Sequence, residues 1–285
     1  MKKEKRWAQV WYKFSRNKAS VAGLVIFLLV LGMAILAPVI APYPRHAGAF
    51  VDFDNASKAP SAAHLLGTDN VGRDILSRIF FSLRSALLMG VLVLAIAVPI
   101  GFGLGLIAGY FQGTVIDILI MRTTDIFLSI PPLVLALAIA SVLEPNLTNA
   151  MIAITVMWWP WYARLAYGTA RSIRTEYFVR YAELTGGSTL YILLREILPN
   201  CVSPVFTKMT LDMGWVIMMG ASLSFVGLGE QPPSPALGNM VADGVKYLPT
   251  QWWMTIFPAL AIVLIVLGFN LLGDGVRDVF TVEEN

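Results

Sequence analysis

Long apolar runs separated by short polar segments dominate the pattern of this chain. A helix rises about 1.5 Å per residue and the hydrocarbon core of a bilayer is about 30 Å thick, so a membrane span needs roughly 20 mostly apolar residues. Six segments reach that length, and they predict an all-α membrane protein with six transmembrane helices. The expected spans are Ala19–Ala41, Ser85–Tyr110, Ile116–Leu143, Asn149–Tyr167, Val202–Leu228 and Trp253–Leu272.

The first apolar run follows a group of basic residues, as the core of a secretory signal would. It is longer than such a core, and Pro38, Pro42 and Pro44 close it without a small-x-small cleavage site. We therefore expect a retained membrane span.

Basic residues indicate the orientation, because cytoplasmic loops carry an excess of Lys and Arg. One group precedes the first span and another lies between the fourth and fifth spans: Lys2, Lys3, Lys5, Arg6, Lys13, Arg16 and Lys18, then Arg171, Arg174, Arg180 and Arg195. Six spans place both termini on one side, which this pattern assigns to the cytoplasm. The opposite loops mix fewer basic residues with aspartates.

This orientation divides the chain into parts with different surroundings. We expect a cytoplasmic segment (1–18), the first span (19–41), an extracytoplasmic loop (42–84), a core of five spans (85–278) with a polar cytoplasmic loop (168–201), and a cytoplasmic tail (279–285). A second outer loop, Gly229–Trp252, contains the turn-rich stretch QPPSPALGN.

The amino-acid composition excludes several kinds of site and function. Hydrophobic residues form 57% of the 285 residues and charged residues only 14%, below the quarter that is usual in soluble domains. One cysteine and two histidines cannot build a disulfide framework or a Cys/His metal site, so we expect no metal and no cofactor. No GxxxxGK[ST] loop and no nucleophile, base and orienting group are recognisable, which argues against an enzyme. The basic surplus serves orientation, so no nucleic-acid partner is expected.

Three glycines in the second expected span fall four residues apart, at positions 101, 105 and 109. This spacing gives one helix a small-residue face, which lets another helix approach closely. The stretch GFGLGLIAG lacks the glycine pattern and preceding strand of a dinucleotide loop, so packing is the favoured interpretation.

Charged residues inside the expected spans form two possible pairs, Arg122 with Asp125 and Lys208 with Asp212. Each pair is three or four residues apart and so lies on one helix face. Local neutralisation near the cytoplasmic interface is the favoured interpretation, with Asp212 facing a partner helix. Ionisable groups in a span are often functional, so a proton pathway stays open as the alternative.

Prolines and tryptophans also mark the spans. Pro131 and Pro132 interrupt the third span, and Pro160 lies in the fourth. We interpret these prolines as simple helix kinks rather than as the broken helices that line the substrate path of some transporters. Five tryptophans near the expected span ends are interpreted as headgroup anchors: Trp158, Trp159, Trp161, Trp252 and Trp253.

The polar stretch RYAELTGGSTLYILLREILPN, residues 180–200, is the most informative interruption. Good helix formers continue to Leu184, and the sequence Thr-Gly-Gly-Ser then ends that helix as a C-cap glycine would. A second helix is predicted over Thr189–Leu198, ending at Pro199. The result is a cytoplasmic helical hairpin, either an ordinary connection or a docking element that transmits a partner's movement to the fourth and fifth spans.

This stretch resembles the EAA loop of the membrane subunits of bacterial ABC importers. The pattern there is Glu-Ala-Ala, three residues, Gly, nine residues, Ile-x-Leu-Pro. Ala182, Gly186, Leu198 and Pro199 match in register, whereas Arg180, Tyr181 and Glu196 replace the Glu, the first Ala and the Ile.

Three other stretches are similar to the dipeptide, oligopeptide and nickel importer permeases, and to the second, C-type, permease of the pair. They are LLGTDNVGRDILSR (65–78), ASLSFVGLGEQPPSPALGN (221–239) and FNLLGDGVRD (269–278), in the family's order. These permeases often carry Glu just before Ala-x-Leu-Ser-Phe, where this chain has Gly220.

The resemblance implies the type I ABC importer permease fold in a bacterial or archaeal inner membrane. It also implies a second permease that completes the pore, two ATP-binding subunits that hydrolyse ATP, and an extracytoplasmic substrate-binding protein. The expected cargo is di- or oligopeptides, with nickel, a metal chelate or an oligosaccharide as alternatives. A proton-driven secondary transporter using Asp125 and Asp212 is the alternative outside this class.

The same resemblance assigns candidate site residues. For contact with the ATPase it indicates Ala182, Glu183, Leu184 and Gly186, with Leu198 and Pro199 positioning the return to the membrane. For the translocation path or its gate the candidates are Asp212, Gly220 and Ser224.

Overall fold

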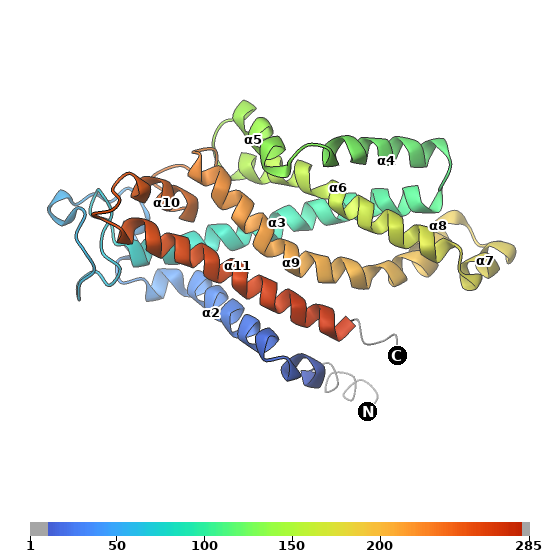
Figure 1. Cartoon of the computed structure of the whole chain (residues 1–285), viewed down its shortest axis with the longest axis horizontal. Helices are drawn as coiled ribbons and strands as arrows, with labels where there is room; N and C mark the ends of the chain where they lie inside the picture. The colour runs from blue at the N-terminus through green and yellow to red at the C-terminus, as the bar shows by residue number, and fades with distance from the viewer. Residues whose placement is uncertain (1–10, 281–285) are drawn as a thin grey trace.

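The computed structural model describes residues 11–280, and within that range it is a bundle of long helices without a β-strand. Most of the long helices run along the longest axis of the molecule (Figure 1). The long elements are α2 (Lys18–Ile40), α3 (Ile75–Tyr110), α4 (Val115–Leu128), α5 (Pro132–Val142), α6 (Leu147–Arg174), α9 (Leu198–Phe225) and α11 (Trp253–Phe280). The short ones are η1 (Pro44–Ala47), η2 (Phe53–Asn55), α7 (Tyr177–Leu184), α8 (Thr189–Tyr191), the π-helical η3 (Ile192–Ile197) and α10 (Leu237–Val245).

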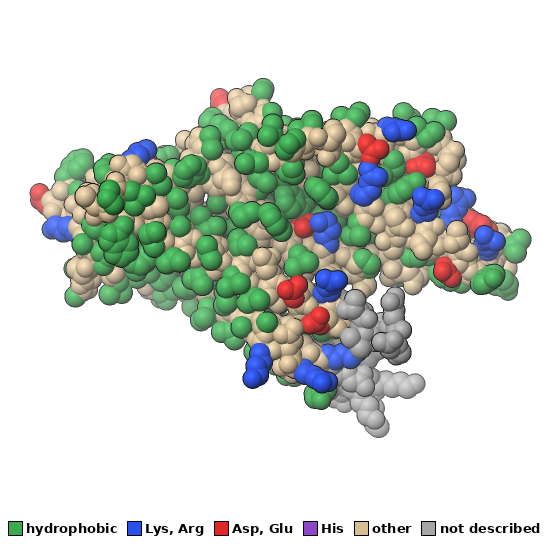
Figure 2. Space-filling view, in the orientation of Figure 1, with side chains coloured by type: hydrophobic (Ala, Val, Ile, Leu, Met, Phe, Trp, Pro, Cys, Tyr) green, Lys and Arg blue, Asp and Glu red, His purple; other side chains and the backbone are tan. Residues whose placement is uncertain are grey.

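The two ends of the bundle differ. The loop after α2 lies with α10 at one end, and α7 and α8 lie at the other (Figure 1). Hydrophobic side chains cover most of the length, whereas charged side chains gather towards the α7 end and around the start of α2 (Figure 2). This distribution suits a molecule whose middle is surrounded by hydrocarbon.

Three helices, α2, α3 and α11, are long and apolar enough by themselves to cross a membrane. The helices of the fourth and fifth expected spans, α6 and α9, are each 28 residues long, about 42 Å, and carry more polar side chains. The helix α3 begins at Ile75 rather than at Ser85, because Asp74 caps it and its first polar residues are buried against the outer loop.

The third expected span is not one kinked helix. It is broken at Pro131 into two helices, α4 and α5, whose axes differ in direction by 90°. Only when the two are taken together are they long and apolar enough to cross a membrane. Two successive prolines remove two backbone donors, and the residue before a proline is driven out of the helical region. Pro131 accordingly has an extended backbone, with ψ 130°, and the prediction of a simple kink is wrong.

The small-residue face predicted in the second span is confirmed. A β-carbon built on Gly101 would lie 2.1 Å from the carbonyl oxygen of Trp159, and one on Gly105 would lie 2.2 Å from that of Ala163. At Gly109 the nearest atom would be the Ala170 β-carbon, at 2.8 Å. The glycines of α3 therefore allow its backbone to touch α6, which sets the position of the helix that leads to α7.

Gly105→Ala is expected to lower stability by about 1–3 kcal/mol, because the added methyl group meets backbone that cannot move away. Gly103→Ala is the matched control on the same helix, since its β-carbon would meet nothing within 4 Å. Thermal denaturation of the detergent-solubilised protein measures both. Equal melting temperatures for the two variants would contradict the close approach of α3 and α6.

Candidate functional site

The polar hairpin between α6 and α9 forms as the sequence predicts up to its turn. Gly186 has a φ of +84°, a conformation that glycine adopts without a steric cost. The Gly187 N–H then donates to the Ala182 carbonyl at 2.9 Å, and the Ser188 hydroxyl accepts from the Tyr191 N–H at 3.3 Å, which starts the next helix. We call residues 175–198 the coupling hairpin.

The second arm of the hairpin does not end at Pro199. The chain stays helical from Thr189 through η3 and on into α9, with Pro199 in the first turn of α9. Pro199 has no backbone N–H to donate, and it directly follows the π-helical turn η3, where the Leu198 N–H donates to the Leu193 carbonyl five residues back. The second arm is therefore a direct extension of α9, without a break between them.

The helix α7 has one buried and one exposed face. Val179 and Ala182 are buried in an apolar cluster with Tyr110, Ile192 and Ile197. On the opposite face Tyr177, Tyr181 and Leu184 are 88%, 69% and 88% exposed. We call these three residues the exposed stripe; their spacing of four and three residues places them on one side of the helix.

The candidate ATPase-contact residues divide between the two faces. Leu184 and Gly186 are exposed at the end of α7, as expected for a contact, and Pro199 is also exposed. Ala182 is only 9% exposed and points into the protein, so its side chain holds α7 in place. Leu198 packs partly buried against the same cluster. Sequence reasoning missed Tyr177 and Tyr181, which helical spacing from Leu184 would have revealed.

Polar contacts fasten the coupling hairpin to the end of α3. The Tyr110 hydroxyl donates to Glu183 Oε1 at 3.4 Å, and the Arg174 guanidinium donates to the Tyr110 carbonyl. The same guanidinium lies 4.9 Å from the centroid of the Tyr110 ring. Glu183, predicted to contact the ATPase, therefore links α7 to α3, and Arg174 links the end of α6 to the same tyrosine.

Asp212 of α9 lies buried at the contact between α9 and α6. It accepts hydrogen bonds from the Trp158 indole at 2.9 Å and from Lys208 Nζ at 3.0 Å. The ammonium of Lys208 also lies over the rings of Trp161 and Tyr162, 5.8 and 5.4 Å from their centroids. The predicted Lys208–Asp212 pair and the contact of Asp212 with a neighbouring helix are confirmed.

Two other predictions about polar residues in the spans are wrong. Asp125 pairs with Arg164 of α6, and no ion pair joins it to Arg122 in residues 11–280. Trp158 and Trp253 are each only 7% exposed, and both use their indole N–H inside the protein, Trp253 towards the Thr68 carbonyl at 3.3 Å. Only Trp161 and Trp252 have the exposure expected of headgroup anchors.

The other two path candidates meet at a small cavity near the α10 end. Gly220 and Ser224 of α9 line it together with residues of α3 and the start of α10. A β-carbon on Gly220 would lie 2.0 Å from Met89 Sδ, so the thioether of α3 fills the space that a larger residue would need. The position where related permeases often carry Glu is thus filled by a methionine.

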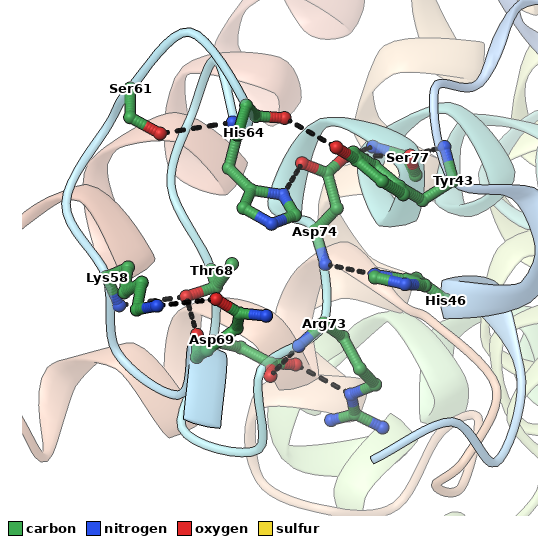
Figure 3. Close-up of polar contacts among 12 residues, drawn as sticks. Tyr43, His46, Lys58, Ser61, His64, Thr68, Asp69, Arg73, Asp74 and Ser77 are labelled. Carbon is green, nitrogen blue, oxygen red and sulfur yellow. Dashed lines mark hydrogen bonds and ion pairs between the residues drawn. The ribbon is translucent and has the colours of Figure 1, made fainter. Parts of the chain in front are cut away.

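The loop between α2 and α3, which the sequence predicts to be extracytoplasmic, is held to the start of α3 by a buried polar network, which Figure 3 shows. His64 Nδ1 lies 2.9 Å from Asp74 Oδ1, and the Asp74 N–H donates to His46 Nδ1 at 2.9 Å. The other carboxylate oxygen of Asp74 accepts from the Ser77 N–H and hydroxyl at 2.8 and 2.7 Å. We call this network the outer latch. Both histidines of the chain therefore serve to fix this loop.

The pKa of His46 is lowered, chiefly because the ring is buried, although the Asp74 carboxylate opposes this effect. A folded-state pKa below the unfolded value, about 6.5, favours the neutral ring in the folded protein. That stabilisation is complete above the unfolded pKa and is lost as pH falls through the folded pKa. Protonation also removes the Nδ1 lone pair that accepts from Asp74.

Lowering the pH from about 8 to about 5 is therefore expected to reduce the melting temperature of the protein, since His46 must become charged. In His46→Asn the side-chain oxygen can still accept from Asp74 but does not titrate, so its melting temperature should fall less over the same range. Parallel melting curves at each pH compare the two. An equal loss in both variants would assign the acid sensitivity to groups other than His46.

Comparison with known proteins identifies the family. Residues 101–281 match the binding-protein-dependent transport system inner membrane component, and residues 5–60 match the N-terminal transmembrane domain of oligopeptide transport permease C. A chain of the MetNI methionine ABC transporter, solved in inward-facing conformations, has the same fold, with a TM-score of 0.56 over 68% of this chain and 93% of that chain, at 20% identity.

Several curated relatives extend over nearly the whole chain. The probable D,D-dipeptide transport system permease protein DdpC of Escherichia coli K12 is 42% identical, covering 95% of this chain and 90% of that protein. The dipeptide transport system permease protein DppC of Haemophilus influenzae is 37% identical, covering 95% and 92%. The glutathione transport system permease protein GsiD of Escherichia coli O6:K15:H31 is 40% identical, covering 95% and 89%. The chain therefore belongs to the family of inner membrane components of binding-protein-dependent transport systems and is a multi-pass ABC importer permease.

Proposed function

We propose that this permease carries di- or oligopeptides into the cell as one of two different permeases around a shared path, with two ATP-binding subunits beneath them and a substrate-binding protein outside. The observation that supports the cargo is that relatives 37–42% identical over 95% of the chain are named for dipeptides. Nickel, a metal chelate or an oligosaccharide remain the alternative cargoes. Hydrolysis of ATP belongs to the partner subunits.

Both termini and the coupling hairpin lie in the cytoplasm in this proposal, and the outer latch and α10 face outward. Four arginines at the α7 end support the orientation, since cytoplasmic segments are rich in basic residues: Arg171, Arg174, Arg180 and Arg195. The six spans are then α2, α3, the broken pair α4 and α5, α6, α9 and α11.

The exposed stripe of α7 is the proposed ATPase contact. Tyrosine is enriched among the few residues that dominate the energetics of protein interfaces, and the stripe supplies two tyrosines, Tyr177 and Tyr181. Closure of the ATPase pair would move α7, and Glu183, Arg174 and the continuous helix into α9 would pass that movement to α3, α6 and α9. Coupling requires the inward- and outward-facing states to differ in affinity for ATP and for delivered substrate.

Asp212, Gly220 and Ser224 are proposed to lie along the path, at two depths of α9. The paired state of the acidic groups favours this function over a proton-driven transporter. Asp125 has Arg164 as its partner and Asp212 has Lys208, so each carboxylate is neutralised locally. A proton relay needs acidic groups that titrate in sequence along the membrane.

Cysteine labelling tests the orientation and the docking together. Wild-type protein is the control for background, because its one cysteine, Cys201, is only 1% exposed. A membrane-impermeant maleimide should label Phe53→Cys in intact spheroplasts, and Leu184→Cys only after the membrane is opened. Co-expression of the ATP-binding subunits should protect Leu184→Cys. Labelling of Leu184→Cys in intact spheroplasts would overturn the orientation, and undiminished labelling beside the ATPase would overturn the docking.

A further inference from the structure

The cavity that Gly220 and Ser224 line, called here the outer cavity, has a volume of about 30 Å³. It lies between α3, α9 and the start of α10, and its polar lining comes from Ser82, Ser85, Ser224 and Glu230. A space of this size holds one or two water molecules, or a single polar group of similar size.

Three of the four polar side chains in the lining have no hydrogen-bond partner in the described part of the chain. Ser224 is only 4% exposed, and neither its hydroxyl nor that of Ser85 makes a hydrogen bond to another described residue. The carboxylate of Glu230 makes no ion pair or hydrogen bond there; only its backbone carbonyl accepts, from Asn239. The Ser82 hydroxyl, by contrast, donates to the Arg78 carbonyl at 2.8 Å.

A carboxylate and two hydroxyl groups that find no partner within residues 11–280 are an unusual set in a cavity whose other lining residues are mainly apolar or glycine. The buried Ser224 hydroxyl would normally have a hydrogen-bond partner, whereas Ser85 and Glu230 are only half-buried, and a half-buried carboxylate gains from a cationic partner. Glu230 is the one charged residue among the described residues of the lining, so the cavity carries a net negative charge. Its occupant should therefore be a cation that also donates hydrogen bonds.

A primary ammonium group has this chemistry. It is about the size of a water molecule, carries one positive charge, and offers three N–H donors for three acceptors, namely the carboxylate of Glu230 and the hydroxyls of Ser85 and Ser224. An α-amino group with a pKa near 8 is mostly protonated at neutral pH, so a free peptide presents such a group.

We propose that the outer cavity binds the terminal ammonium group of the transported peptide, with Glu230 as its counter-ion, and thereby selects substrates with a free amino terminus. The assignment rests on the peptide cargo proposed above. Gly220, where related permeases often have Glu, lines the same cavity, but the space that a side chain at position 220 would need is filled here by the Met89 thioether.

Uptake by the reconstituted complex of both permeases, ATPase subunits and binding protein tests this selection. Glu230→Gln is expected to raise the KM for a free-amine dipeptide about tenfold or more, since it removes a charge-assisted contact. Glu144→Gln, an exposed glutamate before α6, is the matched control and should behave as wild type. The triple variant Met89→Ala, Gly220→Glu, Glu230→Gln returns a carboxylate to the cavity and should recover uptake. Wild-type uptake in Glu230→Gln, or a loss that the triple variant does not recover, would overturn the proposal.

A binding measurement tests the ammonium site independently of the proposal that the transported substrate is a peptide. Methylammonium chloride should raise the melting temperature of the wild-type complex more than tetramethylammonium chloride at equal concentration, and Glu230→Gln should abolish the difference. If the wild-type complex shows this shift but takes up no peptide, the cargo proposal fails and the ammonium site stands. If sodium chloride stabilises the complex as well as methylammonium does, the cavity is an inorganic cation site and the proposal is overturned.

Discussion

Replacing Leu184 with glutamate is expected to release the ATP-binding subunits and to abolish ATP-driven uptake. Leu184 is 88% exposed at the end of α7, beside Tyr181, and it contributes little to the core of the chain itself. A charge placed in the apolar centre of an interface typically costs about 2 kcal/mol or more, which weakens association about thirtyfold. Co-purification of the ATPase with the tagged permease, followed by uptake in proteoliposomes, measures both effects.

Gln112→Glu is the matched control for Leu184→Glu. It adds the same charge at an exposed position of the turn after α3, outside the exposed stripe. Both variants should melt at the wild-type temperature, because neither side chain is buried. Normal co-purification and uptake with Leu184→Glu would show that the exposed stripe is not the docking surface.

Lys208→Met is expected to destabilise the protein by about 3–5 kcal/mol, the usual cost of leaving a buried charge without its partner. Asp212, whose side chain is 6% exposed, would keep the Trp158 indole as a donor but lose the ammonium that balances its charge. Thermal denaturation and the yield of folded protein in detergent should both fall.

The double variant Lys208→Met, Asp212→Asn separates loss of the charge pair from loss of packing. The amide that it introduces at position 212 is neutral and still offers an oxygen to Trp158, so most of the stability should return. Equal stability of Lys208→Met and wild type would mean that Asp212 is protonated or reached by water, and the paired description of this site would then be wrong.

The coupling hairpin shows what local sequence can and cannot predict. Gly186 and the short helix before it follow from helix formers and a C-cap glycine, which are properties of neighbouring residues. The prediction that a helix ends at Pro199 is wrong, because the π-helical turn η3 lets the helix continue through this proline, and local sequence does not reveal that turn. The burial of Ala182 depends on Ile192 and Ile197 across the turn, so tertiary packing decides which face of α7 stays exposed.

The membrane spans also combine features that local sequence predicts with contacts that it does not predict. The glycine spacing of α3 predicts a close helix contact directly, since the face is set by helical periodicity. Nothing local indicates that the contact is with α6, or that Asp212 meets Trp158, 54 residues away. The outer latch joins His46 to Asp74 across 28 residues, and the outer cavity draws on α3, α9 and the segment before α10, so both sites exist only after folding.

The source of energy is the most direct test of the central claim. The two permeases, the ATP-binding subunits and the binding protein can be reconstituted so that ATP is enclosed on the side of the coupling hairpin, and uptake of a labelled dipeptide is then measured. Uptake is predicted to require enclosed ATP and to continue when a protonophore collapses the proton gradient. Uptake that proceeds without ATP under an imposed pH gradient, and stops with the protonophore, would contradict the account and favour a proton-coupled transporter.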